Sequence, residues 1–235
     1  MLMRKVGTII DNLRKGEKAP DRHENPYLKE AIGLSEYLLT QAELGEKYSS
    51  LFTDMTKPIV VEIGCYMGKT VLELVENNKD KNILGLDITY KRVVKAARKL
   101  KRNHLDNGRI AICDGMAFLR DIVPDNSLLG VCVFFPDPWP KERHEKNRLL
   151  KADFIEILFS KLSPQGFFWF KTDHEQYFLE TQKKVLHSGF ISDDEKDFTP
   201  RSKPQNIQGD SYETAFQKLF TMKGVPFYQR VFIKP

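Results

Sequence analysis

The sequence predicts an α/β fold built on a mostly parallel, seven-stranded sheet with helices on both faces. From residue 57 onward, short apolar segments alternate with amphipathic ones at the spacing of right-handed strand–helix–strand units, which favours parallel strands. The short segments are apolar almost throughout, as expected for parallel strands buried on both faces. These two observations indicate a Rossmann-like, doubly wound sheet.

The expected strands and helices alternate along the chain. The helix at 90–102 is the clearest, because Val93, Ala97 and Leu100 share one face. Strands are expected at residues 58–63, 82–88, 109–113, 127–135 and 166–171, with two edge strands at 189–193 and 227–233. The other helices are expected at 69–77, 116–122, 149–162 and 174–188.

The beginning of the chain is less regular. Residues 1–25 are polar and basic without a clear period, and we expect them to form a basic N-terminal arm. Asn25-Pro26 is typical of a helix start, with a capping residue before a proline in the first turn. Apolar side chains continue from there to Leu39, so the sequence predicts one helix that runs to about residue 40.

The remainder is expected to form one domain, residues 26–235, with its core at 57–235. Residues 198–209 carry two prolines and little periodicity, which predicts a long loop. An unstructured loop of that length in a compact domain usually has a function. We therefore expect this loop to be functional.

Composition limits the classes of protein. The net charge of +5 permits contact with nucleic-acid phosphates without requiring it. No apolar run approaches the ~20 residues that span a bilayer, and no signal peptide is recognisable, so we expect a cytoplasmic protein without a membrane partner. Cys65, Cys113 and Cys132 are isolated, without the spacing of metal ligands, which predicts neither a disulfide nor a metal site.

Three acidic residues stand at or near the ends of successive predicted strands. They are Glu62, Asp87 and Asp114. Ligands of open α/β sheets bind beyond the carboxyl ends of the strands, so these side chains are candidates for one binding site. The alternative is that they are solvated strand ends, which would be the favoured interpretation for any one of them alone.

A glycine-containing turn, Glu62-Ile63-Gly64-Cys65-Tyr66-Met67-Gly68, follows the first strand of this sheet. Gly64 and Gly68 allow a tight turn and close approach of the backbone to a ligand. The turn lacks the Gly-x-Gly-x-x-Gly pattern of dinucleotide sites and the Lys-Ser/Thr pair of a phosphate loop. An acid before the turn would repel a pyrophosphate, and it suits a ligand that presents an amino group.

A cationic adenosine derivative with an α-amino group satisfies all three acids. Glu62 would take the amino group, Asp87 the ribose hydroxyls and Asp114 the adenine amino group. S-adenosylmethionine has this chemistry, so we expect it to be the cofactor, with Gly64 and Gly68 beside it.

A carboxylate lies between two prolines at the tip of the fourth strand. The sequence there is Phe134-Phe135-Pro136-Asp137-Pro138-Trp139-Pro140-Lys141-Glu142-Arg143-His144. The prolines restrict the backbone around Asp137, which favours a fixed position for its side chain. Packing does not explain a carboxylate at this position, so Asp137 is the candidate that meets donor and substrate together.

These motifs, in this order, resemble the bacterial tRNA (guanine-N7-)-methyltransferase family from about residue 57 to the end of the chain. The resemblance rests on the glycine turn, Leu86-Asp87-Ile88, Asp114, the Pro136–His144 block, Lys171-Thr172-Asp173 and Ser211-Tyr212-Glu213. It implies a class I methyltransferase fold, S-adenosylmethionine as donor, and methylation of guanine N7 in the tRNA variable loop, at the position numbered 46 by tRNA convention.

The resemblance also implies substrate contacts. Lys141 and Asp173 would contact the substrate, and Ser211, Tyr212 and Glu213 would line the guanine site. Asp210 stands where the family commonly has a substrate-binding threonine, which puts that contact in question. The family also commonly has a second glycine at Tyr66, and His and Arg where Glu145 and Asn147 stand.

The chemistry of N7 constrains the role of Asp137. Guanine N7 carries a lone pair and no proton, so methyl transfer needs position and charge stabilisation and no general base. We therefore expect Asp137 to be the catalytic residue, acting by positioning and by stabilising positive charge. Lys141 and Arg143 can bind phosphates or the Hoogsteen edge of guanine, with His144 and Arg148 on the RNA backbone.

Carboxylates on the substrate side would select guanine over adenine. Asp173 and Glu213 can accept hydrogen bonds from the N1–H and the N2 amino group of guanine. For Asp173 the alternative is a helix N-cap. A basic stripe on the 90–102 helix is either a solvated face or a tRNA contact; it comprises Lys91, Arg92, Lys95, Arg98, Lys99 and Arg102.

Two other functions stay open. A methyltransferase for an exocyclic amine of another RNA base could use a similar acidic turn. A non-catalytic RNA-binding protein could keep this fold, as the change at Tyr66 would allow. The expected macromolecular partner is tRNA, and the sequence leaves the choice between monomer and homodimer open.

Overall fold

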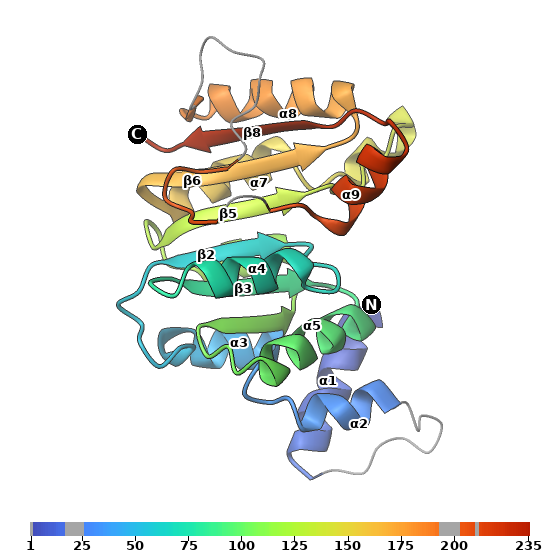
Figure 1. Ribbon diagram of the computed structural model, residues 1–235, viewed down its shortest axis with the longest axis vertical. Coiled ribbons are helices and arrows are strands. Elements are labelled where there is room, and N and C mark those ends of the chain that lie inside the picture. Colours follow the sequence, from blue (N-terminus) through green and yellow to red (C-terminus); the bar gives the residue numbers. More distant parts are fainter. Residues whose placement is uncertain (1, 17–25, 193–202, 210–211) are drawn as a thin grey trace.

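The computed structural model describes residues 2–16, 26–192, 203–209 and 212–235. The described residues form one eight-stranded sheet in the order β1-β4-β3-β2-β5-β6-β8-β7 (Figure 1). The first six strands of this order are parallel, whereas β8 runs antiparallel to both β6 and β7. The strands are β1 (Leu38–Thr40), β2 (Ile59–Ile63), β3 (Asn82–Asp87), β4 (Gly108–Ile112), β5 (Leu128–Phe134), β6 (Leu162–Thr172), β7 (Ile191–Ser192) and β8 (Tyr228–Ile233).

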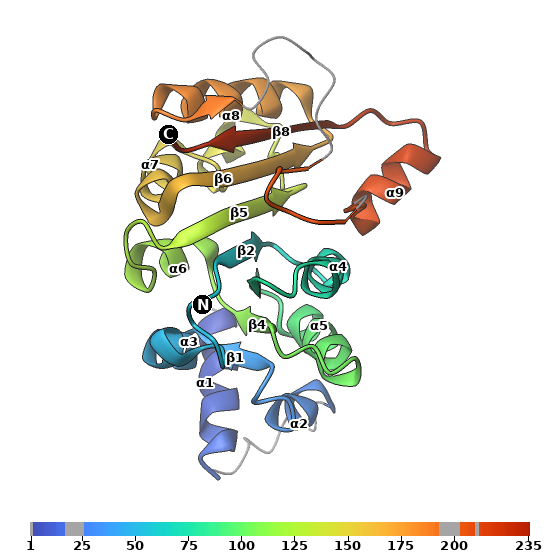
Figure 2. The same cartoon turned by 60° about the vertical axis from the view of Figure 1, so that its left-hand side comes forward.

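Helices cover both faces of the sheet, which confirms the expected doubly wound architecture. In Figures 1 and 2, α4 and α5 lie on one face, and α3, α6 and α7 lie on the other. The described helices are α1 (Leu2–Arg14), α2 (Pro26–Ile32), α3 (Gln41–Lys47), α4 (Lys69–Asn77), α5 (Tyr90–Arg102), α6 (Gly115–Asp121), α7 (Ala152–Lys161), α8 (Glu175–His187) and α9 (Ala215–Met222), with two short 3-10 turns at Tyr48–Ser50 and Glu142–Asn147.

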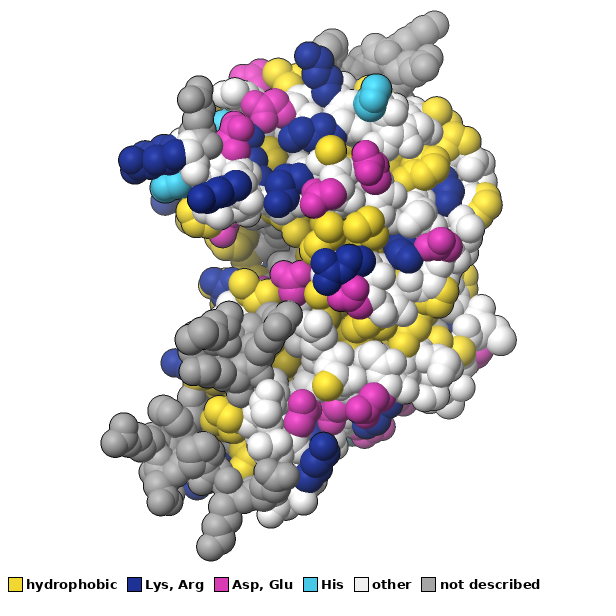
Figure 3. Space-filling view, turned by 180° about the vertical axis from the view of Figure 1, so that it is seen from behind, with side chains coloured by type: hydrophobic (Ala, Val, Ile, Leu, Met, Phe, Trp, Pro, Cys, Tyr) yellow, Lys and Arg dark blue, Asp and Glu magenta, His cyan; other side chains and the backbone are white. Residues whose placement is uncertain are grey.

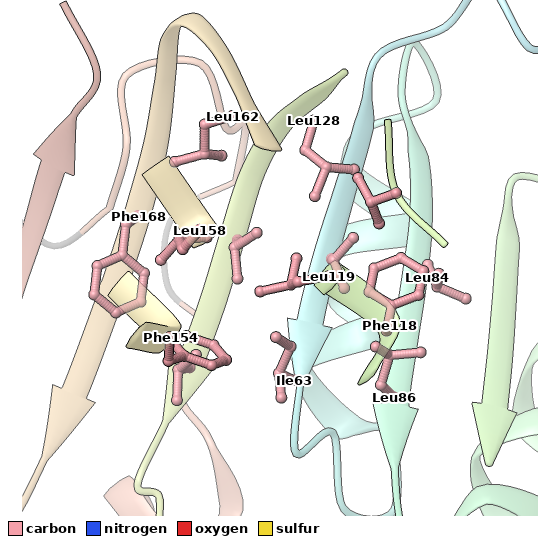
Figure 4. Close-up of a cluster of buried hydrophobic side chains, with 14 of the residues drawn as sticks. Ile63, Leu84, Leu86, Phe118, Leu119, Leu128, Phe154, Leu158, Leu162 and Phe168 are labelled. Carbon is pink, nitrogen blue, oxygen red and sulfur yellow. The ribbon is translucent and has the colours of Figure 1, made fainter. Parts of the chain in front are cut away.

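Each face of the sheet has its own apolar core. On one face, Phe118 of α6 and Phe154 of α7 pack over β2 and β5, as Figure 4 shows with Ile63 and Leu128. On the other face, α4 and α5 pack over β3 and β4 through side chains such as Val71, Val94 and Leu100. Burial on both faces explains why the parallel strands are almost continuously apolar.

One strand was not expected from the sequence. Leu38–Thr40 pairs in parallel with β4, where the sequence predicts a helix that continues to about residue 40. The helix α2 ends at Ile32, and all three residues of β1 are buried. That prediction is wrong because a three-residue strand is too short to show a period, and its apolar residues were assigned to the preceding helix.

The N-terminal residues also differ from the aperiodic arm that the sequence predicts. Leu2–Arg14 is a helix, and its Ile10 is fully buried in the core that α2 and α5 share. The Arg14 guanidinium pairs with Glu43 and donates to the backbone oxygen of Leu38 at 2.8 Å. Helix α1 is therefore anchored to β1 and α3, while residues 17–25 lie outside the described part of the chain.

Helix α9 is a further unexpected element. It follows the expected 198–209 loop, of which the structure describes residues 203–209. No residue of α9 is buried, and in both ribbon views it lies beside the carboxyl ends of the parallel strands (Figures 1 and 2). It brings Phe216 beside the sheet edge at which the acidic residues stand.

Membrane and metal features were searched in the described residues. None of the helices described is long and apolar enough to cross a membrane. No group of His, Cys, Asp and Glu side chains within the described ranges could hold a metal ion. Cys65, Cys113 and Cys132 are free and buried, so each thiol belongs to the core.

Candidate functional site

The candidate site lies at the carboxyl edge of the sheet, where the strand order reverses. β2 is central, with β3 and β4 on one side and β5 and β6 on the other. The connections therefore leave the sheet in opposite directions after β2 and β5, which opens a crevice between their ends. Seen from behind, the molecule is hollowed at this edge, and Lys and Arg side chains gather on the rim above the hollow (Figure 3).

A cavity of about 320 Å³ occupies this crevice, and we call it the acidic cleft. Three carboxylates line it from the ends of three strands: Asp87 is the last residue of β3, Asp114 follows β4 and Asp137 follows β5. Gly64 and Phe216 also line it. The structure thus brings together Gly64 and the three carboxylates, which the sequence places at four separate strand ends. Their roles toward a ligand stay predictions.

Asp87 is fixed by backbone donors. Its carboxylate accepts from the Tyr66 N–H at 3.1 Å and from the Thr89 N–H at 2.8 Å. An Arg92 nitrogen lies 3.8 Å from the same carboxylate. Each carboxylate oxygen has two lone pairs, so two N–H donors leave Asp87 able to accept from hydroxyl groups as well.

Asp114 is the N-cap of α6. One of its oxygens accepts from the Ala117 N–H at 2.9 Å, which satisfies a free donor of the first helical turn. The other oxygen makes no hydrogen bond to any described residue. The cap holds the side chain at the floor of the acidic cleft, and its second oxygen can accept from an exocyclic amino group.

The turn that carries Asp137 has an unusual backbone. Phe135 and Trp139, on either side of the Pro-Asp-Pro sequence, have positive φ angles of 51° and 42°. Such conformations are strained for large side chains and persist only where neighbouring contacts hold them. Asp137 itself is exposed and makes no hydrogen bond to any described residue, so its carboxylate is available in the cleft.

Arg148 supplies the contacts that hold this turn. Its guanidinium donates to the Pro138 oxygen at 2.8 Å and to Glu180 of α8 at 2.7 Å, and it lies over the Tyr177 ring. The side chain is buried. This corrects the expectation that Arg148 contacts RNA, because its donors already serve the turn and α8.

Glu62 opens onto a second cavity, of about 260 Å³, which we call the Glu62 cavity. Gly64, Tyr66, Phe134 and Phe216 line both cavities, so the two are neighbours. Glu62 is only 3% exposed, and its Oε2 atom has no hydrogen-bond partner among the described residues. Burial raises the pKa of Glu62 to about 8, and the positive charge of Lys171 opposes the rise.

The two glycines of the turn have different surroundings. Gly64 has a φ of 82°, and a Cβ atom there would meet no heavy atom within 4 Å, since it faces open space. Gly68 has a φ of 69°, and its Cβ would lie 2.6 Å from the Cβ of Ala96. Gly64 therefore borders both cavities, whereas Gly68 lines neither and allows α4 to approach α5 closely.

Tyr66 stands where the resembled family commonly has a glycine, and it lines both cavities. Its ring lies 5.5 Å from the Phe216 ring and 4.7 Å from the Arg92 guanidinium. Its φ of 51° is the left-handed conformation that glycine adopts more easily. The chain keeps the backbone geometry of a glycine here and adds an aromatic wall.

The predicted guanine-contacting segment is only partly described. Asp210 and Ser211 lie outside the described residues. Tyr212 is 2% exposed, with its ring against Trp169 and its hydroxyl bonded to Asn78, so its side chain is part of the core and lines neither cavity. Glu213 is half-buried, and its carboxylate lies 3.9 Å from the Lys69 ammonium.

The remaining substrate candidates lie on the surface around the cleft. Lys141 and Arg143 are exposed in the short helical region after the proline turn, and Arg143 donates to His144 at 3.2 Å. Asp173 follows β6, beside β5 and its turn. The N-cap of α8 is His174, whose ring accepts from the Tyr177 N–H, so the N-cap interpretation of Asp173 is wrong.

The basic stripe of α5 is partly engaged within the chain. Arg98 pairs with Glu30 of α2, and Lys95 lies over the Tyr27 ring. Lys99 donates to the Met67 oxygen at 2.7 Å and lines the Glu62 cavity. Part of the stripe therefore serves packing against α2 and the glycine turn, which is neither of the two interpretations offered by the sequence alone.

Lys171 is a buried charge that sequence reasoning missed. It lies near the end of β6, and its ammonium donates to the Tyr212 oxygen and to Gln217, each at 3.0 Å. Burial lowers its pKa to about 8. The signal in the sequence was a lysine directly after the apolar run Phe167–Phe170, at a strand position that alternation alone does not mark as functional.

Comparisons with known proteins agree with this geometry. A family model described as "putative methyltransferase" matches residues 56–228. The tRNA (guanine-N(7)-)-methyltransferase of Dechloromonas aromatica is 32% identical over 197 residues, which cover 83% of this chain and 78% of that protein. The enzyme of the same name from Histophilus somni is 35% identical over 176 residues, covering 69% of this chain and 70% of the relative.

Solved structures show the same fold. The crystal structure of the aminoglycoside resistance methyltransferase NpmB1 aligns with a TM-score of 0.54 at 15% identity, over 83% of this chain and 94% of that one. The fold is that of a class I methyltransferase, as expected. Together, the matched span and the relatives confirm the resemblance that the motifs indicated: this chain belongs to the tRNA (guanine-N7-)-methyltransferase family.

Proposed function

We propose that the protein transfers a methyl group from S-adenosylmethionine to N7 of a guanine in the variable loop of tRNA, at the position numbered 46. The observation that carries the proposal is the meeting of Asp87, Asp114 and Asp137 in one cleft beside buried Glu62. Two relatives that are 32% and 35% identical carry the name of this activity. Both lines of support point to the same reaction class.

The residues present fit this donor. Glu62 Oε2 is buried without a partner, and an unpaired buried carboxylate is costly unless a cation or a donor group meets it. The amino group of S-adenosylmethionine would supply both. Asp87 and the free oxygen of Asp114 would accept from the ribose hydroxyls and the adenine amino group, and the open space at Gly64 would admit the ligand beside the backbone.

The reaction makes modest demands on the protein. S-adenosylmethionine, when bound, supplies an electrophilic methyl group on a sulfonium. Guanine N7 has no proton to lose, so the protein must hold the base in line and stabilise the positive charge that develops on it. Asp137 makes no hydrogen bond to the described residues and stands on a turn that two prolines restrict, which suits it to both tasks.

Selection of guanine would come from the other side of the cleft. The Asp173 carboxylate makes no hydrogen bond to any described residue and follows the strand next to β5. It can accept from the N1–H and N2 amino group, which adenine lacks in that arrangement. Lys141 and Arg143 on the exposed rim would contact phosphates or the Hoogsteen edge. Contacts from Asp210, Ser211 and Glu213 stay predictions.

The proposal is tested by methyl transfer to bulk tRNA. Purified protein is incubated with tRNA and S-adenosylmethionine carrying a labelled methyl group, and the nucleosides are then separated. We expect the label in N7-methylguanosine. Label in an N2- or N6-methylated nucleoside would replace the proposal with exocyclic amine methylation, and tRNA binding without any labelled product would indicate a non-catalytic RNA-binding protein.

Three predictions from the sequence accompany the proposal. They are a cytoplasmic location, the division into an N-terminal arm of residues 1–25 and one domain of residues 26–235, and a monomer or homodimer. The helix at Leu2–Arg14 packs on the first strand, so we propose that it moves with the domain. Sedimentation of the purified chain distinguishes the two oligomeric states.

A further inference from the structure

We infer that Lys171 is a positioning residue for methyl transfer, which holds residues 212–217 in place as a shared wall of the two cavities. The inference rests on the proposed function for its link to catalysis. Its structural part, the fixing of this segment by a buried ammonium, stands independently. Neither the acidic strand ends nor the proline turn includes this residue.

The contacts of Lys171 join the sheet to two parts of one segment. The side chain is 2% exposed, and the ammonium has three protons to donate. One donates to the main-chain oxygen of Tyr212 and another to the side-chain oxygen of Gln217, both at 3.0 Å. Tyr212 precedes α9 and Gln217 lies in its first turns, so one charge fixes both the entry to the helix and the helix itself.

The surroundings show that this charge is kept at a cost. The ammonium lies 5.0 Å from the Phe134 ring centre and 4.6 Å from that of Trp169, and the carboxylates of Glu62, Glu73 and Glu213 act on it electrostatically. Burying a charge costs free energy that its partners must offset, and an apolar residue of similar volume often serves stability as well or better. A methionine would fill the space. The positive charge is therefore better explained by what it holds than by packing.

What it holds is a wall of the site. Thr214, Ala215 and Phe216 line the Glu62 cavity, and Phe216 also lines the acidic cleft that contains Asp137. These three residues stand between the two hydrogen-bond partners of Lys171. Their position relative to the donor side of the site thus depends on the two bonds that the ammonium donates.

Helix α9 itself is held by few buried contacts. Tyr212 and Thr214 before it are buried, but α9 has no buried residue, Phe216 is 40% exposed and Met222 is 76% exposed, although the rings of Phe216 and Phe220 contact Phe135. Other polar ties among the described residues are the Lys69 ammonium on the Glu213 oxygen, Asn78 on the Tyr212 hydroxyl, and the Thr214 hydroxyl that caps α9. An element with few buried contacts opens easily, so loss of the Lys171 bonds should release it.

The test compares Lys171→Met with Gln217→Leu, which removes one of the two acceptors. In amide hydrogen exchange without tRNA, we expect residues 212–222 to exchange about tenfold faster in Lys171→Met and less so in Gln217→Leu, because a hydrogen bond from a charged donor is worth about that factor. Lys99→Met is the matched control. It removes a lysine from the Glu62 cavity without touching this segment, so its exchange at 212–222 should match the wild type.

Methyl transfer and unfolding complete the test. We expect the kcat/KM for S-adenosylmethionine to fall about tenfold in Lys171→Met, while its unfolding midpoint stays equal to or above that of the wild type. In Gln217→Leu, which keeps the charge that acts on Glu62, the kcat/KM should fall in the same direction and by less. A merely structural lysine would instead lower both together. Wild-type exchange at 212–222 in Lys171→Met would overturn the inference even if the enzyme methylates N7. If the wild type makes no N7-methylguanosine, the proposed function is overturned. The exchange data would still show whether Lys171 holds residues 212–217.

Discussion

At the scale of single residues, the site depends on which polar groups are already satisfied. Asp87, Asp114 and Arg148 are tied to backbone or side-chain partners, whereas Asp137 and one oxygen of Glu62 have none among the described residues. The tied groups shape the cleft. The free groups are available to a ligand. For Glu62 such a contact would also remove the cost of a buried polar atom without a partner.

Glu62 gives a prediction about pH. Its pKa rises from 4.5 to about 8 on folding because the carboxylate is desolvated. The folded state therefore takes up a proton between these values, and the free energy of unfolding falls as pH rises through this window. In Glu62→Gln this contribution is absent, so the variant should gain stability relative to the wild type from pH 5 to pH 8.

Urea unfolding of both proteins at several pH values, without S-adenosylmethionine, measures the difference. Parallel pH profiles for the wild type and Glu62→Gln would contradict a raised pKa. Asp125→Asn is a suitable control, because that exposed carboxylate pairs with Lys161 and its pKa is lowered, so its effect on stability should not change with pH between 5 and 8.

Single residues also show where sequence reasoning reaches. Asp87, Asp114 and Asp137 were predicted because each follows an apolar run, and the ends of parallel strands meet at one edge. Lys171 and Tyr212 were not assigned correctly. Their burial depends on a segment 41 positions along the chain folding back over β6, and no local pattern carries that information. Arg148 was misassigned for the same reason, since its partner Glu180 is 32 positions away.

At the scale of elements, the turn after β2 separates two uses of glycine. Both Gly64 and Gly68 have positive φ, but only Gly68 is in close contact with a neighbour, Ala96 of α5. Gly68→Ala should therefore lose about 3 kcal/mol of stability, from backbone strain and the clash together. Gly64→Ala should lose only about 1 kcal/mol, from strain alone.

The functional effect should follow the opposite order. Gly64 borders both cavities, so Gly64→Ala should weaken the binding of S-adenosylmethionine more than Gly68→Ala does at a temperature where both are folded. Chemical denaturation and calorimetry of donor binding measure the two properties. Equal loss of stability in both variants would show that the close contact between α4 and α5 is not what requires Gly68.

Hydrophobic periodicity explains the helices that were found. The helices over Lys69–Asn77 and Tyr90–Arg102 have the bounds that the sequence predicts, because each has a sustained apolar face. The strand Leu38–Thr40 was missed because three residues are too few to show a period. The helix Ala215–Met222 was missed although Phe216, Leu219 and Phe220 recur at helical spacing.

At the scale of the whole molecule, the order of the strands in the sheet determines which residues meet at the site. The sequence predicts parallel strands but not which are neighbours, and it was the central position of β2 that brought the ends of β2, β3, β4 and β5 to one cleft. The family model covers residues 56–228, so β1 extends the sheet beyond the matched span, and α1, α2 and α3 also precede that span.

Charge at the same scale predicts how tRNA binds. Lys141 and Arg143 are exposed on the rim after the proline turn. In the double variant Lys141→Ala/Arg143→Ala, the slope of log binding constant against log salt should flatten by about 2, because each phosphate contact contributes about 1. Lys161→Ala is the control, since Lys161 pairs with Asp125 ahead of β5, at the opposite edge of the sheet. Filter binding at four salt concentrations gives both slopes, and an unchanged slope in the double variant would move the RNA interface elsewhere.

The central claim is that this chain methylates guanine N7 in tRNA, with Asp137 at the meeting point of donor and base. The most direct measurement treats tRNA with borohydride and aniline, which cleaves the chain at N7-methylguanosine, after incubation with S-adenosylmethionine and either the wild type or Asp137→Ala. We predict one cleavage in the variable loop for the wild type and none above background for Asp137→Ala. No cleavage with the wild type, or equal cleavage with both proteins, would contradict the account.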